Sequence, residues 1–333
     1  MLKSDDIYDT GKLQQLIENN VGSFKGTVIF LNAIGGAHVE KKSNLTKLNK
    51  DSALCFAKAV DNFLEKRKYI NQSILIQLSS IAAALLKDEY GSVKRETDAC
   101  LLDNYDNIDQ ILCFRVGYVV QSLLKGSIVK DVHDFSPEQL AKYFPLQPII
   151  IYGLHENKIY PVHMQDLVFA ILNTANIYEK NNKVREIVNA TGSEGYTQKE
   201  LFSFYTEKIF KKTFRPFEIP IEAFDEIAKH FPHGHIAPYA GEYIRLQNTK
   251  LDETLFERLL GRKTTSIQAI KDELADPTDA IVSSPIRPFL TAILKKLSNK
   301  EISLKTIKET VAKVIRLTIQ NKYRSKNPIS KDE

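Results

Sequence analysis

Ser73-Ile-Leu-Ile-Gln-Leu-Ser-Ser80 has an aliphatic centre, in which Gln77 is the single polar residue, and it ends in two hydroxyl side chains. A short run of this kind predicts a strand buried on both faces, as in a parallel sheet. The runs Thr27–Ala33, before it, and Ile111–Gly117, after it, have the same character. Apolar residues at helical spacing predict helices around these strands, over residues 11–20, 46–66 and 90–103.

These segments alternate as strand, helix, strand, helix and strand. That order predicts an α/β fold in which a parallel sheet carries helices on both faces. Ligands bind such sheets beyond the carboxyl ends of the strands. Gly35, Ser79, Ser80 and Gly117 all finish or follow a predicted strand, so we expect a functional site there.

Tyr90-Gly-Ser-Val-Lys94 opens the helix that follows the Ser79-Ser80 strand end. Residues four apart lie on one helix face, and a nearby ammonium favours the phenolate, which would bring the pKa of Tyr90 down from about 10. A strand-end hydroxyl could hold a substrate oxygen beside the phenol. The set suits the interconversion of a carbonyl and an alcohol by hydride transfer. The plain alternative is a solvated lysine and a half-buried tyrosine.

These residues resemble the short-chain dehydrogenase/reductase superfamily, in its extended and atypical branches of nucleotide-sugar epimerases, dehydratases and their relatives. The resemblance covers roughly residues 1–265. It rests on several segments in the family's order, namely Asp6-Ile-Tyr-Asp9, Val28–Ala33, Asn49, Ser79-Ser80, Tyr90 with Lys94, Phe114–Gly117, Tyr160–Asp166 and Gly192 with Thr197. Asp6-Ile-Tyr-Asp9 resembles the acidic strand end that lies near the adenine in the family.

The resemblance implies a Rossmann-like parallel sheet, a smaller α/β substrate lobe, NAD or NADP as cofactor and a small-molecule substrate. Ser79 (or Ser80), Tyr90 and Lys94 would be catalytic. The residues that it places at the cofactor are Asp6, Asn32, Ala33, Gly35, Asn49, Lys94, Arg115 and Gly117. Arg115 could as readily be a buried ion-pair partner, and Asp166 is expected to fix the turn into its helix. No metal site is predicted, because the histidines of Pro232-His-Gly-His235 have no convincing partner ligands.

The sequence departs from the family at its glycine-rich turn, Gly-x-x-Gly-x-x-Gly, for which neither Gly22–Gly26 nor Gly35-Gly36 has the right spacing. The chain begins about where the third strand of the family should lie, so an N-terminally truncated sheet is expected. One hypothesis is an NAD(P)-dependent oxidoreductase or epimerase/dehydratase-like protein whose missing unit lies upstream or on another chain. The other is a non-catalytic scaffold or partner-binding protein that has lost tight cofactor binding.

After about residue 120 the strand–helix alternation loosens and prolines punctuate short segments. Helices are predicted there over residues 164–178 and 197–212, the second with Thr197 and Glu200 as a capping box. We therefore expect four regions: a dinucleotide-binding-like domain over 1–120, a substrate lobe interleaved with it over 121–265, a helical extension over 266–320 and a disordered tail over 321–333.

The charge of the chain is uneven. Residues 290–333 hold eleven Lys or Arg and four Asp or Glu, a balance of +7, so that the total of +5 leaves about −2 for residues 1–289. A near-neutral body argues against nucleic-acid binding. The apolar and basic segment 303–320 could pack on the body, bind a partner, or contact an anionic membrane surface. An exposed face of the truncated sheet would favour a homo-oligomer or a protein partner. The absence of a signal peptide and of a long apolar run predicts a cytoplasmic protein.

Overall fold

The computed structural model describes residues 4–36, 43–67, 69–117, 119, 150–152, 158–179, 182–197, 200, 217–219 and 249–270, with residues 309, 312, 313 and 316. The chain divides into two compact units. The first comprises residues 1–120, 160–194 and 249–267, and the second comprises the remaining residues.

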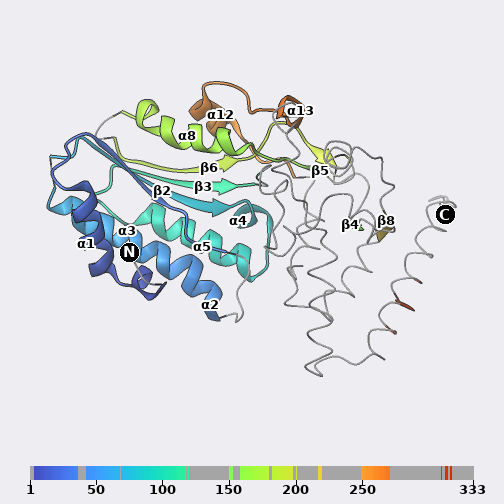
Figure 1. Ribbon diagram of the computed structural model, residues 1–333, viewed down its shortest axis with the longest axis horizontal. Coiled ribbons are helices and arrows are strands. Elements are labelled where there is room, and N and C mark those ends of the chain that lie inside the picture. The colour runs from blue at the N-terminus through green and yellow to red at the C-terminus, as the bar shows by residue number, and fades with distance from the viewer. Residues whose placement is uncertain are drawn as a thin grey trace, which may run out of the picture. The chain divides into compact units, whose positions relative to one another are not determined.

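A four-stranded parallel sheet forms the centre of the first unit (Figure 1). Its strands are β1 (Thr27–Asn32), β2 (Gln72–Ser80), β3 (Gln110–Val116) and β6 (Val184–Ala190), in the order β1-β2-β3-β6. The three predicted strands and the α/β fold are confirmed. β2 and β3 are buried along most of their length, which explains their continuous apolar runs.

Helices cover both faces of this sheet, as the alternation predicted. α1 (Thr10–Val21), α3 (Ser52–Glu65) and α5 (Glu89–Asp103) lie on one face, and α8 (Met164–Ile177) and α12 (Thr254–Leu260) lie on the other (Figure 1). On the first face Phe30 of β1 meets Phe63 of α3 edge-on, with ring centroids 6.2 Å apart. On the second face Phe256 of α12 and Ile171 of α8 pack with Ile76 of β2.

The helix predicted over residues 46–66 is divided in three. α2 (Ser43–Thr46) runs into a π-helical turn, η2 (Lys47–Asp51), which leads into α3. The Asn49 side chain donates to the Leu45 carbonyl, and the Ser52 hydroxyl donates to the Leu48 carbonyl. Side chains that bond to the preceding turn in this way commonly accompany irregular helical geometry.

The segment around Asp6 is a short 3-10 helix, η1 (Ser4–Tyr8), where the resemblance suggested a strand end. The Asp6 carboxylate pairs with Lys12, and the Asp9 side chain caps α1 by accepting from the backbone of Gly11 and Lys12. Asp9, the N-cap of α1, follows Asp6 by only three residues, so the chain must turn here and cannot continue as an extended strand.

Residues 160–194 and 249–267, most of which lie in the region expected for the interleaved substrate lobe, group with residues 1–120 in the first unit. β6 pairs in parallel with β3, and α8 packs against the sheet, so both belong with residues 1–120. Asp166 is buried at the start of α8, where it accepts hydrogen bonds from Arg262 and Thr265. These bonds join the start of α8 to the distant residues Arg262 and Thr265, and the role of Asp166 in the turn into α8 stays a prediction.

In the second unit, β4 (Ile150–Tyr152) pairs in parallel with β8 (Phe217–Ile219), and β5 (Lys158–Ile159) pairs antiparallel with β7 (Tyr196–Thr197). α13 (Ile267–Ile270) spans the boundary between the units. The capping box is present, since the Glu200 backbone donates to the Thr197 hydroxyl and the Thr197 backbone donates to the Glu200 carboxylate. Most of the helix predicted over 197–212, the histidine-containing loop and most of the predicted extension and tail lie outside the described residues. Within the described part of the chain, no helix has the length and apolar character to cross a membrane.

Candidate functional site

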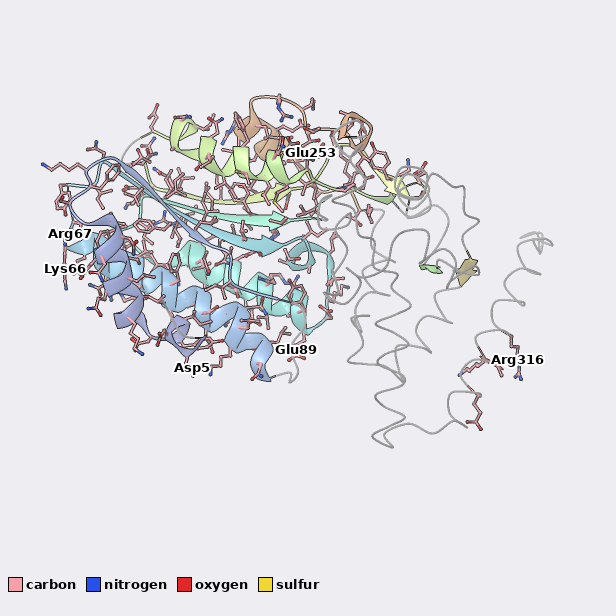
Figure 2. The ribbon with its side chains drawn as sticks, viewed as in Figure 1. Asp5, Lys66, Arg67, Glu89, Glu253 and Arg316 are labelled. Atoms are coloured by element: carbon pink, nitrogen blue, oxygen red, sulfur yellow. The ribbon has the colours of Figure 1, made fainter. Side chains whose placement is uncertain are left out.

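The predicted site lies at the carboxyl ends of β1, β2 and β3, which a parallel sheet brings to one edge. The strand register sets Ser79 beside Arg115 and Ser80 beside Val116. α5 begins near this edge. Figure 2 shows Glu89, the first residue of α5, at the end of the sheet toward which the arrows of β2 and β3 point. The first turns of α5 therefore present Tyr90 and Lys94 beside the strand ends.

Tyr90 and Lys94 lie together, as their spacing predicted. The Lys94 Nζ atom is 5.9 Å from the centroid of the Tyr90 ring. The first turn of α5 is held by Asp88, whose carboxylate accepts a hydrogen bond of 2.8 Å from the Gly91 backbone. Gly91 permits close packing at this turn, because a Cβ there would lie 2.5 Å from the Leu86 carbonyl oxygen.

The hydroxyl that lies beside Tyr90 is that of Ser80, not that of Ser79. Burial raises the pKa of Tyr90, and hydrogen bonding with Ser80 lowers it in part. The Ser79 hydroxyl lies instead beside Asp98, about two turns farther along α5, and lowers the pKa of that carboxyl. The expected lowering of the Tyr90 pKa by Lys94 is wrong, because desolvation of the phenolate is the largest effect and raises that pKa.

Lys94 is a buried ammonium. The residue is only 3% exposed. Burial lowers the pKa of Lys94 to about 8, and the nearby charge of Asp98 opposes part of that fall. Among the residues that the structure describes, none forms a hydrogen bond or a salt bridge with the Lys94 ammonium. A buried ammonium has three donors to satisfy, so this arrangement is costly without an acceptor.

The backbone of Gly35 approaches Lys94 closely. A Cβ on Gly35 would lie 2.8 Å from the Lys94 Nζ atom and 2.9 Å from the Asn49 Oδ1 atom, and the φ angle of +153° favours glycine. Asn49 holds the adjoining turn, since its amide accepts from the Gly36 nitrogen and donates to the Gly36 oxygen. Gly35, Asn49 and Lys94, all predicted to contact the cofactor, are thus brought together.

The other predicted cofactor residues have these positions. Asn32 donates to Gln77 across the strands and accepts from the Ile34 backbone, which engages both ends of its amide. Ala33 is exposed at the end of β1. Gly117 continues β3 and donates to the Ala190 carbonyl of β6. Asp6, in η1, pairs with Lys12, and its contact with a cofactor stays a prediction.

Arg115 is an ion-pair partner. Its Nε atom donates to the Asp98 Oδ2 atom at 2.9 Å, and Asp98 is 1% exposed. Neither Asp98 nor the choice of Ser80 over Ser79 was predicted from the sequence. The available signal for Asp98 was its position four residues after Lys94, which places it on the same face of α5.

Comparison with solved structures identifies enzymes of similar architecture. ADP-L-glycero-D-manno-heptose-6-epimerase from Helicobacter pylori aligns with a TM-score of 0.52 at 14% identity, over 82% of this chain and 77% of its own. UDP-glucose 4-epimerase from Thermotoga maritima aligns with a TM-score of 0.50 at 17% identity, over 85% and 83%. The chain shares the fold of these enzymes.

An NADPH-dependent quinone oxidoreductase from Escherichia coli also aligns, with a TM-score of 0.51 at 12% identity, over 81% of this chain and 82% of its own. The fold that the resemblance implied is therefore confirmed. The sequence itself matches no protein-family model and no curated protein.

Proposed function

We propose that the chain binds the nicotinamide half of NAD(H) or NADP(H) at the carboxyl edge of its sheet and acts as an oxidoreductase or epimerase on a carbonyl or hydroxyl substrate. The observation that supports this most is the Lys94 ammonium, which is buried beside Tyr90 without a hydrogen-bonded partner among the described residues. Such a group calls for a ligand rich in oxygen acceptors. The two hydroxyls of a nicotinamide ribose meet that need.

The neighbours of Lys94 fit the same ligand. Gly35 is exposed, and its missing side chain leaves the space beside the Lys94 Nζ atom open to a ligand. Asn49 fixes the turn that carries Gly35 and Gly36 through two hydrogen bonds. We therefore assign ribose contact to Lys94 and backbone contact to Gly35.

Tyr90 is the group that we assign to proton transfer. In carbonyl reduction the phenol would give its proton to the substrate oxygen, and the resulting phenolate would be stabilised by Ser80 and by the Lys94 charge. In alcohol oxidation the phenolate would take that proton back. A bound nicotinamide would supply or accept the hydride. The carbonyl-anchoring role predicted for Ser79 passes to Ser80 in this proposal, because Ser80 is the serine beside Tyr90.

A fluorescence titration with NADH and with NADPH tests the proposal. We expect saturable binding by the intact chain and a loss of about tenfold or more in affinity for Lys94→Met, since a hydrogen bond to a charged group contributes about 1.5–3 kcal/mol. Lys87→Met is the matched control, because Lys87 is exposed on the approach to α5. Binding of neither nucleotide at millimolar concentration would reject the proposal.

The second candidate is a scaffold that binds a protein partner. It is favoured by one observation, the exposed apolar side chains that line α8, which are Met164, Val168, Phe169 and Leu172. A surface of this kind often marks a protein contact. The nucleotide titration separates the candidates, since a scaffold of this kind requires no cofactor binding.

A further inference from the structure

Asp98 is a buried acidic residue that the proposed chemistry does not use. It lies one helical turn after Lys94 on α5, and the residue is 1% exposed. A carboxylate this deeply buried is costly unless nearby groups compensate its charge. Its neighbours therefore indicate why it is retained there.

A residue of the sheet binds the Asp98 carboxylate. Arg115, on β3, donates to its Oδ2 atom at 2.9 Å. The Oδ1 atom has no hydrogen-bond partner among the described residues, and the Ser79 hydroxyl on β2 likewise has none. The Ser79 hydroxyl nevertheless lies near enough to lower the pKa of Asp98, without meeting hydrogen-bond geometry.

Within the described ranges, four groups face this carboxylate from the elements packed around it. They are Arg115 and the Cys113 thiol on β3, Ser79 on β2 and the Lys94 ammonium on α5. Burial raises the pKa of Asp98, whereas Ser79, Arg115 and Lys94 lower it. Arg115 thus favours the ionised carboxylate, and that negative charge acts in turn on Lys94.

In the part of the chain that the structure describes, few other groups compensate the charge of Lys94. Tyr90 on the same helix, the neutral Asn49 amide and the Gly35 backbone surround its Nζ atom. The effect that raises its pKa against the cost of burial is the charge of Asp98. The pair Arg115–Asp98 therefore connects the strand end of β3 to the ammonium on α5.

We infer that Asp98 is a positioning residue, which Arg115 anchors to the sheet so that its carboxylate keeps the Lys94 ammonium charged beside Tyr90. The consequence for cofactor binding and proton transfer rests on the proposed function. The electrostatic coupling between Asp98 and Lys94 does not, because it is a property of the protein without cofactor.

The coupling is measurable by NMR on protein labelled with ¹³C at lysine Cε. In the wild type one signal, which is lost in Lys94→Arg, should titrate near pH 8. In Asp98→Asn its midpoint should fall, so that the neutral fraction of Lys94 at pH 7 rises from about a tenth by several-fold. Asp98→Glu keeps the charge and should leave the midpoint close to that of the wild type.

Glu96→Gln is the matched control. Glu96 lies on the same helix but is exposed and pairs with Lys50 at 3.1 Å, so its loss should leave the Lys94 midpoint unchanged. An unchanged Lys94 midpoint in folded Asp98→Asn would overturn the inference. If Asp98→Asn does not fold, the wild-type ¹³Cγ signal of Asp98, identified through Asp98→Glu, should show a step at the Lys94 midpoint, and its absence would overturn the inference equally.

The nucleotide titration adds a separate outcome. If the wild type binds NADH, Asp98→Asn should weaken that binding several-fold at pH 7.5, and Asp98→Glu should restore most of it. If the wild type binds neither nucleotide while the Lys94 midpoint still depends on Asp98, the proposed function fails and the positioning of Lys94 by Asp98 stands.

Discussion

A lysine that is 3% exposed loses most of the hydration that its ammonium has in the unfolded chain. The pKa of Lys94 falls from its ordinary 10.5 to about 8 in the folded protein. Below pH 8 both states carry the charge and the folded state bears the full cost of burial. Between pH 8 and 10.5 the unfolded state alone holds the proton, so stability rises with pH across that window.

Lys94→Met should therefore stabilise the protein at pH 7, by up to about 3 kcal/mol, while it weakens nucleotide binding. The gain should shrink as the pH rises above 8. Urea denaturation at pH 7 and at pH 9.5 measures both values. Equal destabilisation by Lys94→Met at both pH values would show that burial of the charge is not the dominant cost at this position.

Gly35 provides a second prediction at the residue scale. Gly35→Ala would place a Cβ 2.8 Å from the Lys94 Nζ atom in a backbone conformation that L residues rarely adopt. We expect a loss of about 1–2 kcal/mol in stability and weaker NADH binding. The control is Gly22→Ala, where φ is +54° and a Cβ would meet no atom within 4 Å, so stability should fall and NADH affinity should not.

At the scale of the element, strand and helix types were predictable from the sequence. β2 and β3 are buried on both faces, so their apolar runs are continuous. β6 was harder to detect, because Arg185 and Glu186 interrupt its apolar pattern. The two terminal guanidinium nitrogens of Arg185 donate to backbone carbonyls of the loop before β3, which no periodicity reveals.

The site was predictable to the level of the element and less so to the level of the atom. Tyr90 and Lys94 follow from helical spacing, since residues four apart share a face. The choice between Ser79 and Ser80 depends on which hydroxyl at the end of β2 meets the first turn of α5, and therefore on the face to which each serine points. An apolar strand buried on both sides gives no alternation from which that face can be determined.

The N-terminus of α5 carries the prediction that belongs to this scale. Asp88 accepts from the Gly91 backbone at 2.8 Å, so Asp88→Ala should cost about 1 kcal/mol and Asp88→Ser should recover most of it. Because Tyr90 lies in the same turn, NADH affinity should fall with Asp88→Ala. Thermal unfolding and the nucleotide titration measure the two effects, and unchanged values for both would contradict a structural role for this cap.

At the scale of the whole molecule, the first unit is assembled from three separate stretches of chain, residues 1–120, 160–194 and 249–267. A boundary drawn along the sequence at residue 120 separates β3 from its partner β6. The last stretch supplies α12, whose Phe256, Leu259 and Leu260 are buried against α8 and the sheet. Long-range packing of this kind leaves no local signal in the sequence.

Phe256 tests whether the distant stretch completes the core. It is 0% exposed and packs in the cluster formed by β2, β3, β6 and α8, so Phe256→Ala should cost about 3–5 kcal/mol. Phe169 on α8 is 53% exposed, and Phe169→Ala should change the free energy of unfolding by less than about 1 kcal/mol. Urea denaturation of both variants measures the difference. Similar small losses of unfolding free energy in both variants would show that residues 249–267 are dispensable for the first unit. A large loss in Phe256→Ala alone would show that the sheet depends on a segment more than 50 residues beyond its last strand.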